Sequence, residues 1–203
     1  MKFYLKTLLG QKSLPITVVS GLPRSGTSMM MKMLEAGGIP PLTDKIRVAD
    51  EDNPKGYYEF ERVKKLPDGD VDWLPEAQGK SVKVIAALLE HLPDDYTYRV
   101  IFINRAMEEI LASQKKMLEH REEAAKVSDK KMAALFEKHK RNVTTWMKEQ
   151  KNFTYIEISY NELLKDPLSG LRKVNQFLGG NLDIKKMAAV VDQKLYRQKI
   201  DKI

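Results

Sequence analysis

Short runs of apolar, β-branched residues alternate along the chain with longer segments in which apolar residues recur at the spacing of a helical turn. Runs of the first kind, bounded by turn formers, are typical of buried strands, and segments of the second kind are typical of amphipathic helices. The pattern predicts strands over residues 16–20, 81–85, 98–104 and 153–159. It predicts helices over residues 25–36, 107–123, 129–150, 167–178 and 183–191.

Strands that alternate with helices favour a parallel sheet covered on both faces. The expected fold class is therefore α/β, a three-layer sandwich with a central parallel sheet, formed as a single domain over residues 1–203. Ligands of such sheets bind beyond the carboxyl ends of the strands, where the loops after Ser20, Ile85 and Asn104 should converge. Residues 40–79 are rich in proline, glycine and acidic residues, and they are predicted to be mostly loop with one helical turn after Glu59.

Composition narrows the class of protein. The 203 residues suffice for one well-buried domain, and 42% hydrophobic with 31% charged residues is ordinary for a globular protein. A net charge of +7 is compatible with an anionic ligand. The chain has no cysteine and no apolar stretch of membrane-spanning length, so a cytoplasmic protein without a membrane span is predicted. The basic segment 129–150 offers no aromatic stacking platform beyond Trp146, so we expect it to cover the sheet and expect no nucleic-acid partner.

The loop after the first strand, GLPRSGTS, has the glycine spacing of a phosphate-binding Walker A loop. Backbone N–H groups in such a turn, together with the positive end of the following helix, form a seat for an anion. Thr27 stands where a Walker lysine would follow Gly26, and Arg24 lies inside the loop instead. The third strand ends in Asn104 rather than in an aspartate that would help to hold magnesium. The loop is therefore predicted to bind an anion without a metal.

The segment SGLPRSGTSMM resembles the 5′-phosphosulfate loop of the sulfotransferases that use 3′-phosphoadenosine 5′-phosphosulfate (PAPS), whose loops read Pro-Lys/Arg-Ser-Gly-Thr-Thr/Ser. It is especially similar to bacterial and protein-tyrosine members of that family, which have a P-loop-like fold. The resemblance implies that the 5′-phosphosulfate contacts the loop residues Arg24, Ser25, Gly26, Thr27 and Ser28.

Two further segments extend the resemblance from about Val18 to Gly180. In VIFINRAMEEILAS, Arg105 ends the strand and Ser113 follows eight positions later, the family's spacing for residues that together grip the 3′-phosphate. The segment ISYNELLKDPLSGLRKVNQFLGG places Tyr160 where family members bring a tyrosine to the adenine ring.

The resemblance also assigns catalytic roles. Charge moves onto the bridging oxygen of the leaving nucleotide during sulfuryl transfer, and a cation there stabilises the transition state, a role predicted for Arg24. Lys83 matches the lysine of the family's Lys-Thr-His stretch and would contact the transferring group. The catalytic histidine of that stretch falls on Ile85, which is a departure from the family, and His91 is an alternative base six residues later.

Carboxylates offer another source for the base, because other sulfotransferase branches use a glutamate from the segment after the first helix. We rank Glu59 first and Asp44 second, and the branch's own glutamate position is Pro54. The carboxylates of this segment are Asp44, Asp50, Glu51, Asp52, Glu59 and Glu61.

Three functions are weighed against one another. The first is a PAPS-dependent sulfotransferase that acts on a hydroxyl of a small molecule, a saccharide or a tyrosine. The second is a metal-dependent kinase of a small molecule, disfavoured by the absent Walker lysine. The third is a non-catalytic module that binds PAPS or adenosine 3′,5′-bisphosphate, for which Ile85 is the best support. The acceptor and the oligomeric state stay open.

Overall fold

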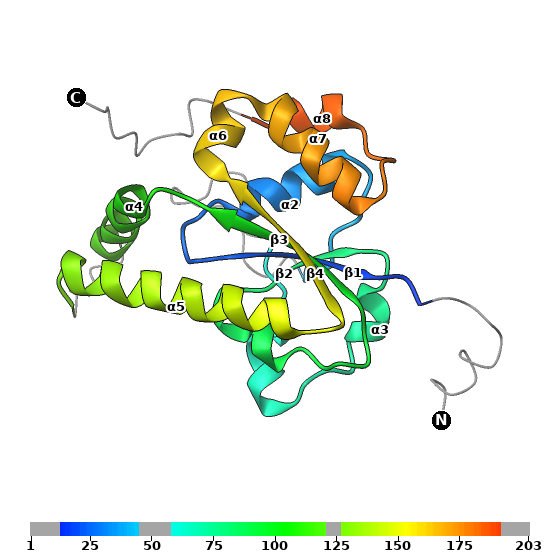
Figure 1. Cartoon of the computed structure of the whole chain (residues 1–203), viewed down its shortest axis with the longest axis horizontal. Helices are drawn as coiled ribbons and strands as arrows, with labels where there is room; N and C mark the ends of the chain where they lie inside the picture. Colours follow the sequence, from blue (N-terminus) through cyan, green and yellow to red (C-terminus); the bar gives the residue numbers. More distant parts are fainter. Residues whose placement is uncertain (1–12, 45–57, 121–126, 192–203) are drawn as a thin grey trace.

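A parallel sheet forms the centre of the molecule in the computed structural model, which describes residues 13–44, 58–120 and 127–191 (Figure 1). Its strand order is β2-β1-β3-β4. Every neighbouring pair is parallel, and the register pairs Val18 with both Val82 and Val100. The strands are β1 (Ile16–Gly21), β2 (Ser81–Lys83), β3 (Tyr98–Asn104) and β4 (Phe153–Ser159).

Helices cover both faces of this sheet. In Figure 1, α2 (Thr27–Ala36), α6 (Tyr160–Lys165), α7 (Pro167–Leu178) and α8 (Ile184–Ala188) lie on one side. The other side carries α3 (Leu74–Ala77) and α5 (Asp129–Glu149), and α4 (Met107–His120) lies beside the first part of α5. Two 3₁₀ helices, η1 (Glu61–Asp68) and η2 (Ala86–His91), complete this layer. The predicted fold class, an α/β three-layer sandwich with a central parallel sheet, is confirmed.

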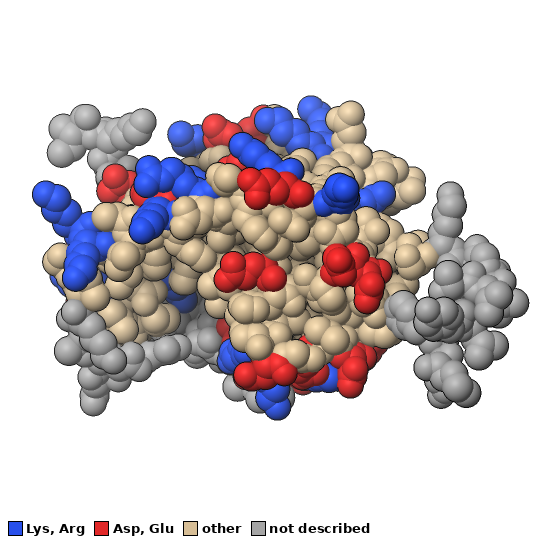
Figure 2. Space-filling model, turned by 60° about the horizontal axis from the view of Figure 1, so that its bottom comes forward, with Lys and Arg blue, Asp and Glu red and all other residues tan. Residues whose placement is uncertain are grey.

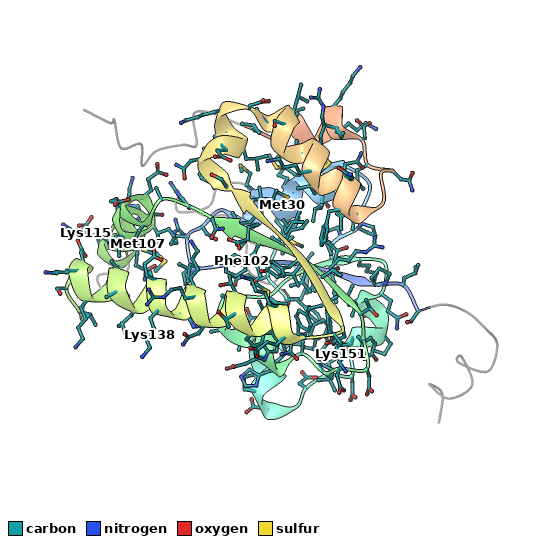
Figure 3. The ribbon with its side chains drawn as sticks, viewed as in Figure 1. Met30, Phe102, Met107, Lys115, Lys138 and Lys151 are labelled. Atoms are coloured by element: carbon teal, nitrogen blue, oxygen red, sulfur yellow. The ribbon has the colours of Figure 1, made fainter. Side chains whose placement is uncertain are left out.

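Alternate residues of the central strands face two separate apolar cores, because successive side chains of a strand point to opposite faces. On one face Ile16, Val100 and Phe102 pack with residues of α3 and η2 and with Met147 of α5. On the other face Ile101 packs with residues of α2, α7 and α8. Figure 3 shows Met30 of α2 and Phe102 of β3 inside the molecule. Burial on both faces explains why the strands read as nearly continuous apolar runs.

The C-terminal half of α5 packs on the sheet, as predicted for the basic segment 129–150. Met147 is buried, and the Trp146 ring meets the Phe153 ring edge-on, with 5.2 Å between the centroids. The exposed Lys115 of α4 and Lys138 of α5 lie at the outer surface in Figure 3. In Figure 2, Lys and Arg side chains gather at the left end of the molecule, whereas Asp and Glu side chains lie over the middle of the face in view. None of the helices in the described ranges combines the length and the apolar character needed to cross a membrane.

The structure departs from the predicted elements in several places, and the last helix, predicted over 183–191, is observed only as α8 (Ile184–Ala188). The second strand is shorter than predicted, because Ile85 is already the extended residue that precedes η2. Helix α6 was not predicted, and its first turn is capped by Ser159, whose Oγ accepts a hydrogen bond from the Glu162 N–H. The segment after Glu59 holds η1 and α3 rather than a single helical turn. The predicted end of the helix over 107–123 lies outside the described residues.

Candidate active site

The loop between β1 and α2 forms a tight turn at the carboxyl edge of the sheet. Arg24 has a positive φ of 65°, and Gly26 has a φ of 103°. A Cβ on Gly26 would lie 2.3 Å from Cδ2 of Tyr160, so only glycine lets the loop approach this ring. Within the part of the chain that the structure describes, no side chain caps the start of α2, whose N-cap residue is Gly26. The loop therefore presents the positive end of a helix, the feature from which anion seats are built.

The hydroxyl of Ser25 lies inside the loop. It is fully buried, and its Oγ has no hydrogen-bonding partner among the residues that the structure describes. A Cβ on Gly21 would come within 2.5 Å of this oxygen. A buried hydroxyl without a partner is costly and calls for an explanation, such as a ligand that satisfies it.

Two arginines from distant parts of the chain meet at this loop. Arg24 Nε donates a hydrogen bond to Ser113 Oγ over 2.9 Å, which joins the loop to α4. Arg105 follows β3 directly, and its Nη1 donates to the backbone oxygen of Arg24 over 3.1 Å. The structure thus brings together three residues that were predicted to bind the nucleotide, with the Ser113 hydroxyl hydrogen-bonded to the Arg24 side chain.

A buried network holds the Arg105 side chain. Its Nε donates to Glu109 Oε2 over 2.8 Å, and the side chains of Arg105 and Glu109 are only 8% and 3% exposed. The guanidinium carbon lies 4.6 Å from the centroid of the Tyr160 ring, a cation–π contact. Burial raises the pKa of the Tyr160 hydroxyl, and the positive charge of Arg105 opposes this rise. Asn161 Nδ2 donates to the other carboxylate oxygen of Glu109 over 2.7 Å.

Lys83 lies at the end of β2 beside the start of α2. Its Nζ is 3.4 Å from Ser28 Oγ and 3.4 Å from Glu59 Oε1. The side chains of Lys83 and Glu59 are 10% and 18% exposed, so the pair is largely shielded from water. Thr43 Oγ1 donates to the backbone oxygen of Glu59 over 2.8 Å. The predicted sulfuryl-contacting lysine and the predicted base are therefore neighbours.

The second candidate base, Asp44, is hydrogen-bonded to a backbone N–H. Asp44 Oδ2 accepts a hydrogen bond from the Glu61 N–H over 2.6 Å, next to the start of η1. Asp50, Glu51, Asp52 and Pro54, which belong to the same predicted segment, lie outside the described residues.

Tyr58, the residue before Glu59, is hydrogen-bonded to α2. Tyr58 has a positive φ of 53°, unusual for a residue with a side chain, and its hydroxyl donates to a carboxylate oxygen of Glu35. Burial and the neighbouring Glu35 carboxylate raise the pKa of this hydroxyl well above its ordinary value. The anchor was not predicted, and it places the backbone that carries Glu59.

The position at which the resemblance predicts a histidine holds an apolar side chain at the surface. Ile85 is 45% exposed just after β2. His91, the alternative base, lies at the end of η2, where its Nε2 is 3.9 Å from an oxygen of Glu90. Among the described residues there is no group of three or more His, Asp or Glu side chains arranged to hold a metal ion.

Two residues of the site were missed from the sequence, Glu109 and Asn161. Glu109 stands four positions after Arg105, one helical turn along α4, so the spacing could have suggested an ion pair. Asn161 gives no comparable signal, because its contact with Glu109 depends on how α6 is placed relative to α4.

Comparison with known proteins adds an independent finding. The family model "Sulfotransferase domain" matches residues 15–199. The sulfotransferase domain of the Synechococcus PCC 7002 olefin synthase superimposes with a TM-score of 0.54 and 14% identity, over 93% of this chain and 85% of that one. Sulfotransferase STF9 from Mycobacterium avium gives a TM-score of 0.54 and 13% identity, over 99% and 73% of the two chains. Sulfotransferase STF1 from Mycobacterium tuberculosis H37Rv gives a TM-score of 0.54 and 15% identity, over 96% of this chain and 76% of that one.

The comparison with curated proteins gives no match. The structural similarities, at such low identity, show the fold, and they agree with the predicted sulfotransferase fold. The family model covers all three segments on which the predicted resemblance rests. The chain therefore belongs to the sulfotransferase domain family.

Proposed function

We propose that this chain transfers a sulfuryl group from PAPS to a hydroxyl acceptor, acting as one domain over residues 1–203. Membership of the sulfotransferase family supports transferase activity. The observation that carries the proposal is the junction of Arg24, Ser113 and Arg105, held by hydrogen bonds of 2.9 and 3.1 Å at the start of α2. Two guanidinium groups at the start of a helix would suit a nucleotide with phosphates at both the 3′ and the 5′ positions.

The residues present fit such a nucleotide. The buried Ser25 hydroxyl lacks a partner among the described residues, and it could donate a hydrogen bond to a phosphate oxygen. Thr27, Ser28 and the loop amides would hold the 5′-phosphate, and Arg105 with Ser113 the 3′-phosphate. Tyr160, whose ring touches the loop at Gly26, would approach the adenine.

The remaining side chains would act on the reaction. When bound, PAPS supplies the sulfuryl group. Arg24 would stabilise charge that develops on the leaving oxygen, and Lys83 would contact the transferring group. Glu59, 3.4 Å from Lys83, would take the proton of the acceptor hydroxyl, with Asp44 as the second candidate. These charges come from side chains, so the proposal requires no metal.

Thermal unfolding with adenosine 3′,5′-bisphosphate tests the nucleotide site. In EDTA, the product nucleotide at about 100 times its Kd should stabilise the fold by about 2.7 kcal/mol and raise Tm accordingly. Adenosine without phosphates is the matched control and should leave Tm unchanged. Stabilisation by ATP with magnesium, and none by the bisphosphate, would instead favour the kinase and reject the proposal.

A non-catalytic nucleotide-binding module is the second candidate, because the apolar Ile85 holds the family's histidine position at the surface. Release of adenosine 3′,5′-bisphosphate from PAPS, followed across small alcohols, saccharides and tyrosine peptides, separates the two. We expect release with at least one acceptor class. In Glu59→Gln the rate of release should fall by about 100-fold or more.

Glu76→Gln is the control for that substitution, because Glu76 also pairs with a lysine, Lys80, but at the exposed end of α3. Its rate should equal that of the unmodified protein. If no acceptor supports release while the bisphosphate still raises Tm, the chain is the binding module. If Glu59→Gln keeps its full rate, the base is another residue.

A further inference from the structure

A buried carboxylate lies behind the arginine that is proposed to meet the 3′-phosphate. The Glu109 side chain is 3% exposed, and its Oε2 is 2.8 Å from Arg105 Nε. Burying an ion pair costs much of what the mutual attraction returns, so stability alone is a weak reason for the pair. The position of the pair beside the loop suggests a role in binding.

The network around Glu109 requires two acceptor oxygens. Oε2 accepts from Arg105, and Oε1 accepts from Asn161 Nδ2 over 2.7 Å. The Asn161 amide cannot be reversed without loss, because its Oδ1 accepts the Ala106 N–H over 3.1 Å. A glutamine at position 109 would offer one acceptor oxygen and an NH₂ group that faces another donor. Only a carboxylate satisfies both partners.

Three contacts together fix the orientation of the Arg105 guanidinium. Its Nε bonds to Glu109, its Nη1 bonds to the Arg24 backbone oxygen over 3.1 Å, and its face lies on the Tyr160 ring. A planar guanidinium held at one nitrogen, at one edge and on one face has little rotational freedom left. Such fixing lowers the entropy lost when a ligand binds.

We propose that Glu109 is a positioning residue that holds Arg105 for the 3′-phosphate and so sets the preference for nucleotides that carry this group. The inference rests on the proposed PAPS site. It makes Asn161 a second support, since this residue orients Glu109 from the start of α6.

The sign of the effect separates positioning from charge alone. The negative charge of Glu109 lowers the positive potential around Arg105. If charge alone mattered, its removal would tighten the binding of a 3′-phosphate. If positioning matters, its removal weakens that binding despite the gain in positive potential.

Calorimetric titration with two nucleotides tests the proposal. The quantity measured is the ratio of the Kd of adenosine 5′-phosphate to the Kd of adenosine 3′,5′-bisphosphate. In Glu109→Gln this ratio should fall by about tenfold, the order of a lost hydrogen bond to a charged group. Asp70→Asn is the matched control, because Asp70 also pairs with an arginine, Arg62 on η1, and its ratio should not change.

Each outcome decides the matter. A ratio that is unchanged or higher in Glu109→Gln overturns the proposal, and so does an equal loss of affinity for both nucleotides, which would mark a merely structural role. A failure of the unmodified protein to prefer the bisphosphate would instead reject the proposed function itself.

Asn161→Ala keeps the test usable if Glu109→Gln does not fold. This variant leaves the Arg105–Glu109 pair in place but removes the amide that orients the carboxylate. The ratio should fall by about threefold, less than in Glu109→Gln. An unchanged ratio in a folded Asn161→Ala, shown by an unaltered circular dichroism spectrum, counts against the proposal.

Discussion

At the residue scale, the candidate site depends on how closely the loop approaches Tyr160. Gly26 lies directly against this ring, and the other side of the contact is stiff because Tyr160 is buried and stacked with Arg105. An aromatic ring in such a place cannot swing aside as the end of a flexible side chain can. The absence of a side chain at position 26 therefore sets the distance between the loop and α6.

Gly26→Ala should destabilise the fold by about 3 kcal/mol, because the new methyl group would meet the ring at 2.3 Å and alanine is strained at a φ of 103°. Gly38→Ala is the control, with a similar φ of 106° and nothing within 4 Å of the new Cβ. It bears only the backbone strain, about 1 kcal/mol. Urea unfolding measures both, and equal losses would show that the ring is not a barrier.

The residues of the candidate site differ in how well their positions could be predicted from the sequence. Arg24 and Lys83 come from motifs with fixed spacing; Arg24 lies in the loop, and the structure brings Lys83 to the start of α2, 3.4 Å from Ser28 Oγ. Glu59 was chosen among six carboxylates of one segment, and the structure gives the reason for preferring it, its contact with Lys83. The Ser113 hydroxyl bonds to Arg24 because the left-handed backbone at Arg24 turns that side chain toward α4, and no pattern in the sequence specifies this turn.

At the element scale, the long strands were predictable, whereas the short helices α3 and α6 were not. The strands predicted over 98–104 and 153–159 match β3 and β4. The central strand β3 is buried on both faces and reads as an apolar run, whereas β4 lies at the edge of the sheet and its run is interrupted by the exposed Thr154 and Glu157. Helix α6 has only six residues, too few to show a helical period, and it depends on its Ser159 cap and on packing against α7. The elements between Glu59 and Gly79 are likewise short, and the apolar residues that anchor them, such as Trp73, are separated by polar ones.

At the scale of the whole molecule, the sheet brings together parts that the sequence separates. The order β2-β1-β3-β4 places β1 between β2 and β3, so Lys83, the loop after Gly21 and Arg105 share one edge of the sheet. Helix α6 follows β4 and brings Tyr160 to the same edge. Four segments that span most of the chain therefore depend on one packing arrangement, and a ligand that bridges them should act on all of them together.

Hydrogen exchange with bound adenosine 3′,5′-bisphosphate tests this coupling. At about 100 times the Kd, amides that exchange only after the ligand leaves should slow by about 100-fold. We expect this in the loop 22–26, in the first turns of α4 and at the start of α6, and also in β1 and β3, which should open only when the whole fold opens.

Amides of η1 and α3 should keep their exchange rates, because these elements can open while the nucleotide stays bound. Adenosine 5′-phosphate at the same occupancy should protect the loop but leave the first turns of α4 less protected, since it lacks the group that Arg105 and Ser113 are proposed to hold. Protection confined to the loop with both nucleotides would mean that α4 takes no part in binding, and equal protection of η1 and α3 would mean that the molecule opens only as a whole.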